Sequence, residues 1–166
     1  MTQIHNERRL SLRYRPQNLS KKACYRYECI IKYKRLSISR IYSSANAINA
    51  REFLKEVIYE FDFPIKSIQV DGGSEFMGEF EEYCEQEKIK LYVLPPRSPK
   101  MNCYVERTNE TYRYEFWNVY EIPDTIEETR KLLRKFEYKY NFERPHQSLN
   151  YLTPIEYYNR MIENAA

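Results

Sequence analysis

Glycine, histidine and tryptophan are scarce in this chain of 166 residues, which contains three glycines, two histidines and one tryptophan. The two histidines lie far apart, and no two of the four cysteines have Cys-x-x-Cys spacing, so a structural zinc site is not expected. Apolar neighbours of the cysteines favour reduced, packed thiols in a reducing compartment. A chain of this length can bury a sizeable core without disulfides or metal, and we expect one domain.

Long apolar segments are also missing. No stretch approaches the roughly 18 consecutive apolar residues of a membrane-spanning helix. Arg8, Arg9 and Arg13 interrupt the N-terminal sequence, which argues against a signal peptide. These absences predict a soluble, cytoplasmic protein that has no membrane partner.

Neither sign of charge dominates the composition, since 27 Lys and Arg residues stand against 24 Asp and Glu residues, for a net charge of +3. Basic residues nevertheless gather in residues 1–40, whereas the rest of the chain is balanced or acidic. This asymmetry is compatible with a surface that faces phosphate groups, and equally with a solvated edge of the fold.

Hydrophobic periodicity predicts alternating strands and helices. The expected strands are residues 2–10, 23–33, 36–42, 65–70 and 89–94; the expected helices are 47–61, 74–88, 102–117, a helix capped by Asp124, and a last one that starts at Thr153-Pro154. This order predicts an α/β domain of three layers around a mixed sheet, followed by additional helices.

Two acids occupy positions suited to chemistry. Asp71 follows the apolar run 65–70 and precedes Gly72-Gly73, and ligands of open α/β sheets bind at such strand ends. Glu106 lies one turn into a helix, after a loop rich in proline. Carboxylate oxygens suit Mg²⁺ in phosphoryl transfer. Each acid alone has an ordinary alternative, as a turn or cap residue for the first and as a partner of the helix dipole for the second.

The sequence around these acids contains three longer motifs. Residues 71–76 read Asp-x-Gly-x-Glu-Phe, residues 98–107 read Ser-Pro-x-x-Asn-x-x-x-Glu-Arg, and residues 140–154 read Tyr-Asn-x-x-Arg-Pro-His-x-x-Leu-x-x-x-Thr-Pro. Over nearly the whole chain, this pattern resembles the catalytic core of bacterial insertion-sequence transposases related to retroviral integrases, the DDE family. The resemblance implies a ribonuclease H-like fold with a mixed five-stranded sheet, flanked by helices and extended by further C-terminal helices.

The resemblance also implies a domain division and an activity. Residues 1–122 would form the integrase-like catalytic core, and residues 123–166 a C-terminal helical extension of the same domain. The implied activity is DNA transposition, in which three carboxylates hold two Mg²⁺ or Mn²⁺ ions that promote DNA strand cleavage and transfer. Asp71 would be the second catalytic, metal-binding acid and Glu106 the third. DNA is the implied partner, together with further copies of the chain and no small-molecule cofactor.

Other residues receive roles through the same resemblance. Asn102, Arg107 and Lys100 would face the nucleic acid. His146 would pack or form hydrogen bonds in the C-terminal helical layer and would not bind metal. No helix-turn-helix region precedes the core, so recognition of specific DNA ends is expected to be absent from this chain.

The first acid of the family lies on the first strand, in a pattern like Gln-x-Asp-x-Lys, and the matching segment here places His5 at that position. A neutral imidazole offers one nitrogen, whereas a bridging carboxylate offers two hard oxygens and a negative charge. We therefore expect a degenerate core with little or no strand transfer. Glu7 would substitute only after a two-residue shift of the strand, which keeps the same face. The alternatives are an active core separated from its DNA-binding domain, and a non-catalytic ribonuclease H-like nucleic-acid-binding module.

Overall fold

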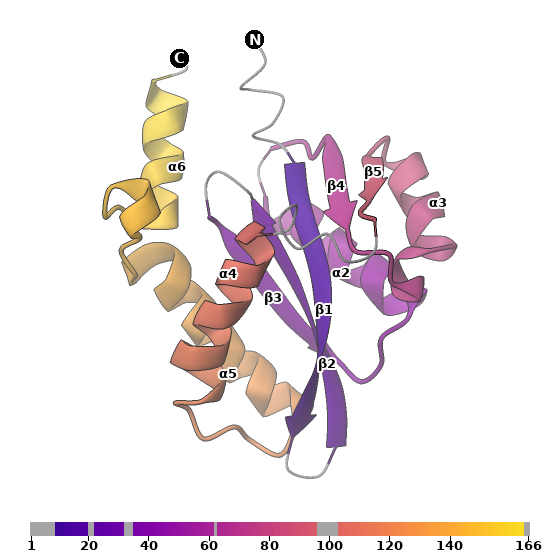
Figure 1. Cartoon of the computed structure of the whole chain (residues 1–166), viewed down its shortest axis with the longest axis horizontal. Coiled ribbons are helices and arrows are strands. Elements are labelled where there is room, and N and C mark those ends of the chain that lie inside the picture. Colours follow the sequence, from indigo (N-terminus) through magenta and orange to yellow (C-terminus); the bar gives the residue numbers. More distant parts are fainter. Residues whose placement is uncertain (1–8, 20–21, 32–34, 62, 96–102, 165–166) are drawn as a thin grey trace.

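A mixed five-stranded sheet forms the centre of the computed structural model, which describes residues 9–19, 22–31, 35–61, 63–95 and 103–164. The strand order is β3-β2-β1-β4-β5 (Figure 1). The strands are β1 (Arg9–Leu19), β2 (Lys22–Ile31), β3 (Ser37–Tyr42), β4 (Ser67–Val70) and β5 (Lys90–Val93). β1, β2 and β3 pair antiparallel in sequence order, whereas β4 runs parallel to both β1 and β5. The predicted mixed sheet is therefore confirmed.

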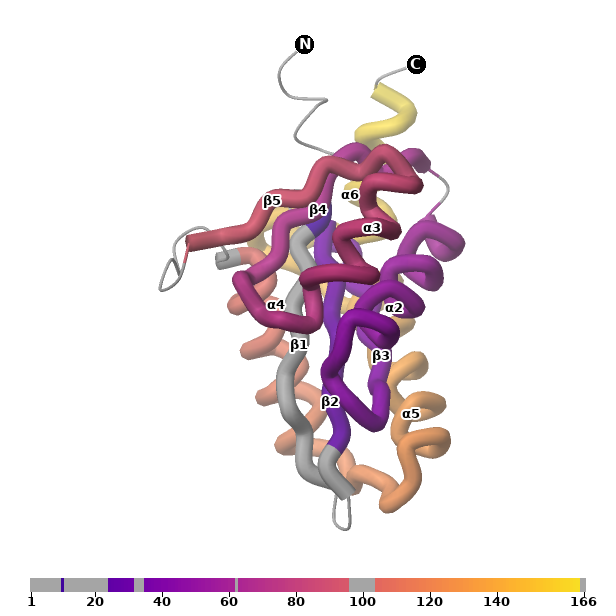
Figure 2. Tube along the Cα trace, turned by 90° about the vertical axis from the view of Figure 1, so that its right-hand side faces the viewer, coloured from indigo at the N-terminus to yellow at the C-terminus, as the bar shows by residue number. Residues whose placement is uncertain are grey.

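Helices cover both faces of this sheet and complete the three predicted layers. One side carries α2 (Ala47–Glu60), the short η1 (Ser74–Phe76) and α3 (Glu79–Gln86). The other carries α4 (Cys103–Tyr112), η3 (Arg113–Trp117), α5 (Ile126–Tyr138) and η4 (Lys139–Glu143), after which η5 (Gln147–Leu149) leads to α6 (Pro154–Glu163). Figure 2 shows α2 and α3 side by side on their face of the sheet. None of the helices in the described part of the chain combines the length and apolarity needed to cross a bilayer.

Two hydrophobic clusters lie on the two faces of the sheet. The larger one joins the inner faces of β2, β3 and β4 to α2 and α3, with Phe53 and Phe80 among its fully buried rings. The smaller one joins the sheet to α4, η3, α5 and η4 through aromatic contacts: the ring of Phe136 lies 5.0 Å from Tyr112 and 5.2 Å from Phe116, centroid to centroid. Cys24, Cys29 and Cys84 are buried free thiols, as predicted.

The first strand lies further along the chain than predicted. The strand expected at residues 2–10 overlaps β1 only at Arg9 and Leu10, and residues 1–8 lie outside the described part of the chain. β1 also contains Pro16, which lacks the N–H that a central strand requires. The pairing explains why this proline is tolerated: β4 pairs with β1 only up to Leu12, so further along β1 the described ladder continues on the β2 side alone.

Two helix boundaries also differ from the prediction. The helix expected at residues 74–88 is divided into η1 and α3, because Gly78 adopts φ 58° and ψ −115°, a conformation open to glycine. Asp124 does not cap α5, since the cap is Thr125, whose hydroxyl accepts a hydrogen bond from the backbone N–H of Glu128. α6 starts at Thr153-Pro154 as predicted, and Thr153 is its cap.

Two helices widen at their C-terminal ends. α4 continues into the π-helical turn η3, where the N–H of Asn118 donates to the carbonyl of Arg113, five residues earlier, at 3.0 Å. α5 continues into η4 in the same way, and the N–H of Arg144 donates to the carbonyl of Lys139 at 2.8 Å. Turns of this kind are rare and often lie at functional sites.

Candidate active site

Asp71 lies directly after β4 and is half-buried. Ile68 and Val70 of β4 belong to the cluster under α2 and α3, so alternation directs the position of Asp71 to the opposite face, which α4 covers. The first site acid is therefore at a strand end, where the sequence places it.

Glu75, four residues after Asp71, is a second acid at this turn that the sequence analysis did not assign. Its side chain is buried, with 4% of the residue exposed, and it folds back over Gly73. A Cβ on Gly73 would lie 2.2 Å from Oε1 of Glu75, so this glycine makes room for a carboxyl group. Burial raises the pKa of Glu75, a backbone hydrogen bond opposes that rise, and the charge of Asp71 adds to it. The motif Asp-x-Gly-x-Glu thus brings two carboxyl groups together.

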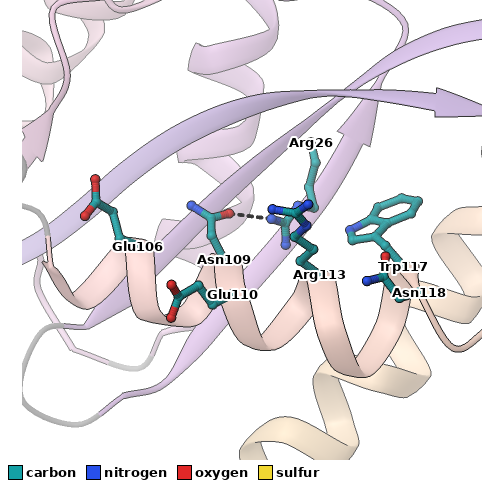
Figure 3. Close-up of a pocket in the computed structure, with 7 residues that line it drawn as sticks. All are labelled: Arg26, Glu106, Asn109, Glu110, Arg113, Trp117 and Asn118. Carbon is teal, nitrogen blue, oxygen red and sulfur yellow. Dashed lines mark hydrogen bonds between the residues drawn. The ribbon is translucent and has the colours of Figure 1, made fainter.

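Glu106 lies in the first turn of α4 and is half-buried. Figure 3 shows Glu106 and Asn109 projecting from the same side of α4 toward the strands. α4 packs across β1 and β2, whereas Asp71 follows β4, the neighbour of β1 on its other side. The two acids predicted from the sequence therefore flank β1.

β1 itself carries no acid. Its sequence is RLSLRYRPQNL, and its register with β4 pairs Leu12 with Val70, so the next β1 position, beside Asp71, is Arg13. His5, the position predicted from the motif, lies outside the described residues. Among the residues that the structure describes, no group of three His, Cys, Asp or Glu side chains could hold a metal ion. The donor set seen here does not fit a site of three carboxylates and two metal ions.

Of the three residues predicted to face nucleic acid, Arg107 lies in the described part of the chain. Arg107 extends from α4 with 77% of its side chain exposed, and its guanidinium lies 3.5 Å from the carboxylate of Glu110. A surface pair of this kind is weak and leaves the arginine accessible to a phosphate group. Lys100 and Asn102 lie outside the described residues.

A buried polar cluster beneath α4 was missed from the sequence. Arg26 on β2 is 2% exposed; its Nη2 donates to Oδ1 of Asn109 and lies 3.2 Å from Oε2 of Glu28. The guanidinium also lies 4.7 Å from the ring centre of Tyr112, in a cation–π contact. The available signal was the pair Arg26 and Glu28, two positions apart among the otherwise uncharged residues 23–31, because that spacing places both on one face.

The C-terminal motif has a structural role, as the sequence predicted for His146. Arg144 forms a double ion pair with Glu115 of η3, with distances of 2.8 and 2.6 Å. His146 is buried with its ring 4.8 Å from that of Tyr140, and its backbone N–H donates to the carbonyl of Leu152 at 3.0 Å. Burial, followed by the positive charge of Arg144, lowers the pKa of His146 to about 4. The motif ties the end of α5 to α4 and to the start of α6.

Comparison with known proteins gives consistent matches. Residues 87–154 match the family described as Integrase core domain. A protein named "Putative integrase ORF3" from Spiroplasma virus SpV1-C74 is 29% identical over 157 residues, with 84% of this chain and 43% of that protein covered. The "Insertion element IS407 uncharacterized 31.7 kDa protein" of Burkholderia multivorans is 29% identical over 93 residues, with 55% of this chain and 33% of that protein covered. The chain thus spans less than half the length of either relative.

Solved structures agree with the fold. The catalytic core domain of BIV integrase superposes with a TM-score of 0.72 at 15% identity, covering 96% of this chain and 98% of that one. The HTLV-2 integrase catalytic core in complex with magnesium gives 0.68 at 14% identity, covering 89% and 93%. A chain of the simian T-cell lymphotropic virus intasome in complex with PP2A regulatory subunit B56 gamma gives 0.72 at 16% identity, covering 84% and 50%.

The architecture is therefore that of an integrase catalytic core, an α/β fold of the ribonuclease H-like type. The family match, the two relatives and the motifs together support a DDE integrase or transposase core, as the resemblance implied.

Proposed function

We propose that this chain is a core for DNA transposition, of the type that cleaves and transfers DNA strands with divalent metal ions, and that its catalytic centre is degenerate. One observation carries the proposal: Asp71 and Glu106 are retained on the elements that flank β1, whereas β1 has no carboxylate. The names of the two relatives, an integrase and an insertion-element protein, support the reaction class.

We assign Asp71 and Glu106 as the surviving catalytic and metal-ligating acids. The position of the family's first acid is held by His5 if the sequence motif is followed and by Arg13 if the pairing of β1 with β4 is followed. Neither residue supplies the hard, negatively charged oxygen ligands that Mg²⁺ prefers. Two metal ions in a shared site depend on the charge of all their carboxylates. Strand transfer by this chain is therefore expected to be weak or absent with Mg²⁺ or Mn²⁺.

We also propose DNA as the partner, contacted by Arg107 and by the neighbouring Asn102 and Lys100, and assembly with further copies of the chain. The dimeric HTLV-2 core and the viral intasome among the structural neighbours support an assembly. The division into a core at 1–122 and a C-terminal extension at 123–166 of the same domain is supported by the cluster that α4 and α5 share.

A nicking assay on supercoiled DNA with Mg²⁺ or Mn²⁺ tests the proposal. The unmodified chain and Glu106→Ala are expected to leave the DNA intact. Restoring an acid by Arg13→Asp or His5→Asp is expected to produce nicking that disappears when Glu106→Ala is added. Efficient nicking by the unmodified chain, lost in Glu106→Ala, would show that the centre is active and that the degeneracy is wrong.

The second candidate is a non-catalytic ribonuclease H-like module that only binds nucleic acid. The incomplete set of metal ligands among the described residues favours it. Its signature is DNA affinity that falls with salt, as phosphate contacts require, and that survives loss of both Asp71 and Glu106. Loss of DNA binding in that double variant would count against this candidate.

A further inference from the structure

An open edge of the sheet lies beside α3. β5 is the last strand of the sheet in the described part of the chain, and Figure 1 shows it at one side of the molecule with α3 next to it. A hollow of about 580 Å³ lies between the two elements. Its lining includes Glu81, Glu82 and Glu85 of α3 and Lys90, Leu91 and Val93 of β5.

Alternate backbone groups of β5 point away from the sheet. The N–H groups of Lys90 and Leu94 donate to backbone carbonyls on the β4 side, at 3.0 and 2.9 Å. Because these groups alternate in direction along a strand, the N–H and C=O groups of Leu91 and Val93 point to the open edge. The side chain of Val93 is 52% exposed there. An edge of this kind is a template for one more strand.

The α3 wall of the hollow is acidic. Residues 78–90 contain five glutamates and two lysines, which gives a net charge of −3. The helix dipole stabilises Glu82 in the first turn of α3, but it disfavours Glu85 in the last turn, which has no basic residue. Both side chains are exposed, and neither forms an ion pair with another described residue. A cation brought into the hollow would therefore offset the repulsion among these acids.

We propose that β5 and α3 bind an extended segment of a partner protein, which adds to the sheet beside β5 and carries Lys or Arg at alternate positions. Main-chain hydrogen bonds to Leu91 and Val93 give affinity, as in other cases of strand addition. Since the side chains of a strand alternate between two faces, every second residue of the added segment lies over the hollow. A lysine or arginine there covers Leu91 and Val93 with its aliphatic stem and brings its charge to Glu82 and Glu85.

The same negative charge disfavours two other occupants. The glutamates would repel DNA phosphates, so this surface differs from the proposed DNA contacts at Arg107. A second copy paired antiparallel through β5 would form one continuous sheet and bring its own α3 to the same face, where the acids of the two helices repel one another. A basic segment of another protein meets neither difficulty, and its binding does not depend on strand cleavage.

Amide hydrogen exchange distinguishes strand addition from simple charge attraction. Nitrogen-15-labelled full chain would be titrated with the blocked peptide Thr-Lys-Val-Lys-Val-Lys-Thr. In the free chain, the amides of Leu91 and Val93 should exchange faster than those of Lys90 and Leu94, which donate within the sheet. A peptide concentration of about ten times Kd should slow exchange at Leu91 and Val93 about tenfold.

Two N-methylated peptides, one for each alternate set of peptide residues, test the main-chain hydrogen bonds. Methylation of the set whose N–H groups face β5 should abolish binding, and methylation of the other set should leave it. A peptide of the same composition with its three lysines consecutive keeps the charge, loses the alternation and should bind more weakly.

Substitution of the acids tests the charge. Glu82→Gln and Glu85→Gln keep the shape of exposed side chains and remove their charge. Each should weaken binding about two- to fivefold, which is the range of an exposed ion pair. Glu127→Gln and Glu163→Gln, exposed acids of α5 and α6 outside the hollow, are the matched controls and should bind as the unmodified chain does.

The proposal would be overturned if the alternating peptide did not bind, or bound without slowing exchange at Leu91 and Val93. Equal affinities of the two methylated peptides, or of the charge variants and their controls, would also overturn it. Protection of both amides in the free chain, together with a dimer in analytical ultracentrifugation, would assign the edge to a second copy instead. Oligothymidine at matched ionic strength should not displace the peptide, and displacement would count against a surface separate from the DNA contacts.

Discussion

Acidification is expected to destabilise this fold through His146. His146 is 8% exposed, and its imidazole lies against Tyr140 with the guanidinium of Arg144 3.5 Å from its Nδ1. Burial and that positive charge lower the pKa of His146 from 6.5 to about 4. Between these two values the unfolded chain binds a proton that the folded chain excludes. The contribution of the neutral His146 to stability is therefore fully present above about pH 6.5 and is lost as the pH falls toward 4.

The size of the effect follows from the shift. A difference of one pKa unit corresponds to about 1.4 kcal/mol, so the full change from 6.5 to about 4 amounts to about 3.4 kcal/mol. Between pH 7 and pH 5 the loss due to His146 is about 2 kcal/mol. This is a large part of the free energy of unfolding of a small domain, which is about 5–15 kcal/mol.

Urea titrations of the unmodified chain and of His146→Phe at pH 7 and pH 5 would measure this loss. Phenylalanine keeps a ring against Tyr140 but binds no proton. On going to pH 5, the unmodified chain should lose about 2 kcal/mol relative to the variant. Other titrating groups are common to both proteins and cancel in the comparison. Parallel pH profiles for the two proteins would show that His146 does not titrate differently in the folded and unfolded states, and would refute the reasoning.

Three other substitutions have defined outcomes. Burial raises the pKa of Glu137 from 4.5 to about 7. The contribution of the protonated Glu137 to stability is therefore present below pH 4.5 and is lost as the pH rises through 7. Glu137→Gln should remove this pH dependence of stability in the same urea titrations. Gly73→Ala would drive a methyl group into the Glu75 carboxyl and should cost about 1–3 kcal/mol of stability, whereas the methyl group of Gly72→Ala meets only ordinary contacts. Equal melting temperatures of the Gly73→Ala and Gly72→Ala variants would contradict this. Thr153→Ala removes the cap of α6 and should cost about 1 kcal/mol in thermal unfolding, and an unchanged melting temperature would argue against the cap.

Much of the fold could be predicted because apolar periodicity follows burial. The helix expected at 47–61 is α2, and the expected segments 65–70 and 89–94 contain β4 and β5. β1 was misplaced because its arginines and Pro16 hide an alternating pattern. Strand pairing on a single side, which makes that proline acceptable, is a property of the assembled sheet and is not visible in a local window.

The candidate site was predictable only for residues whose position depends on the local chain. Asp71 at a strand end and Glu106 in a first helical turn are of this kind. The burial of Arg26 depends instead on Asn109, which is 83 residues away. A charged residue in a strand is ordinarily expected to face solvent, so only the packing of α4 on the sheet shows that this one is enclosed.

The π-helical turns η3 and η4 each contain one residue more than an α-helical turn, at the C-terminal ends of α4 and α5. Removing one residue between Arg113 and Trp117 would tighten that turn into an ordinary α-helix and leave the downstream connection nearly in place. Removing one between Glu106 and Tyr112 would instead rotate all later side chains by about 100° and swing the buried tyrosine out of the core. Loss of one residue from the segment 139–143 would be absorbed in the same way at the end of α5. Length changes in related chains are thus most easily absorbed at these two turns.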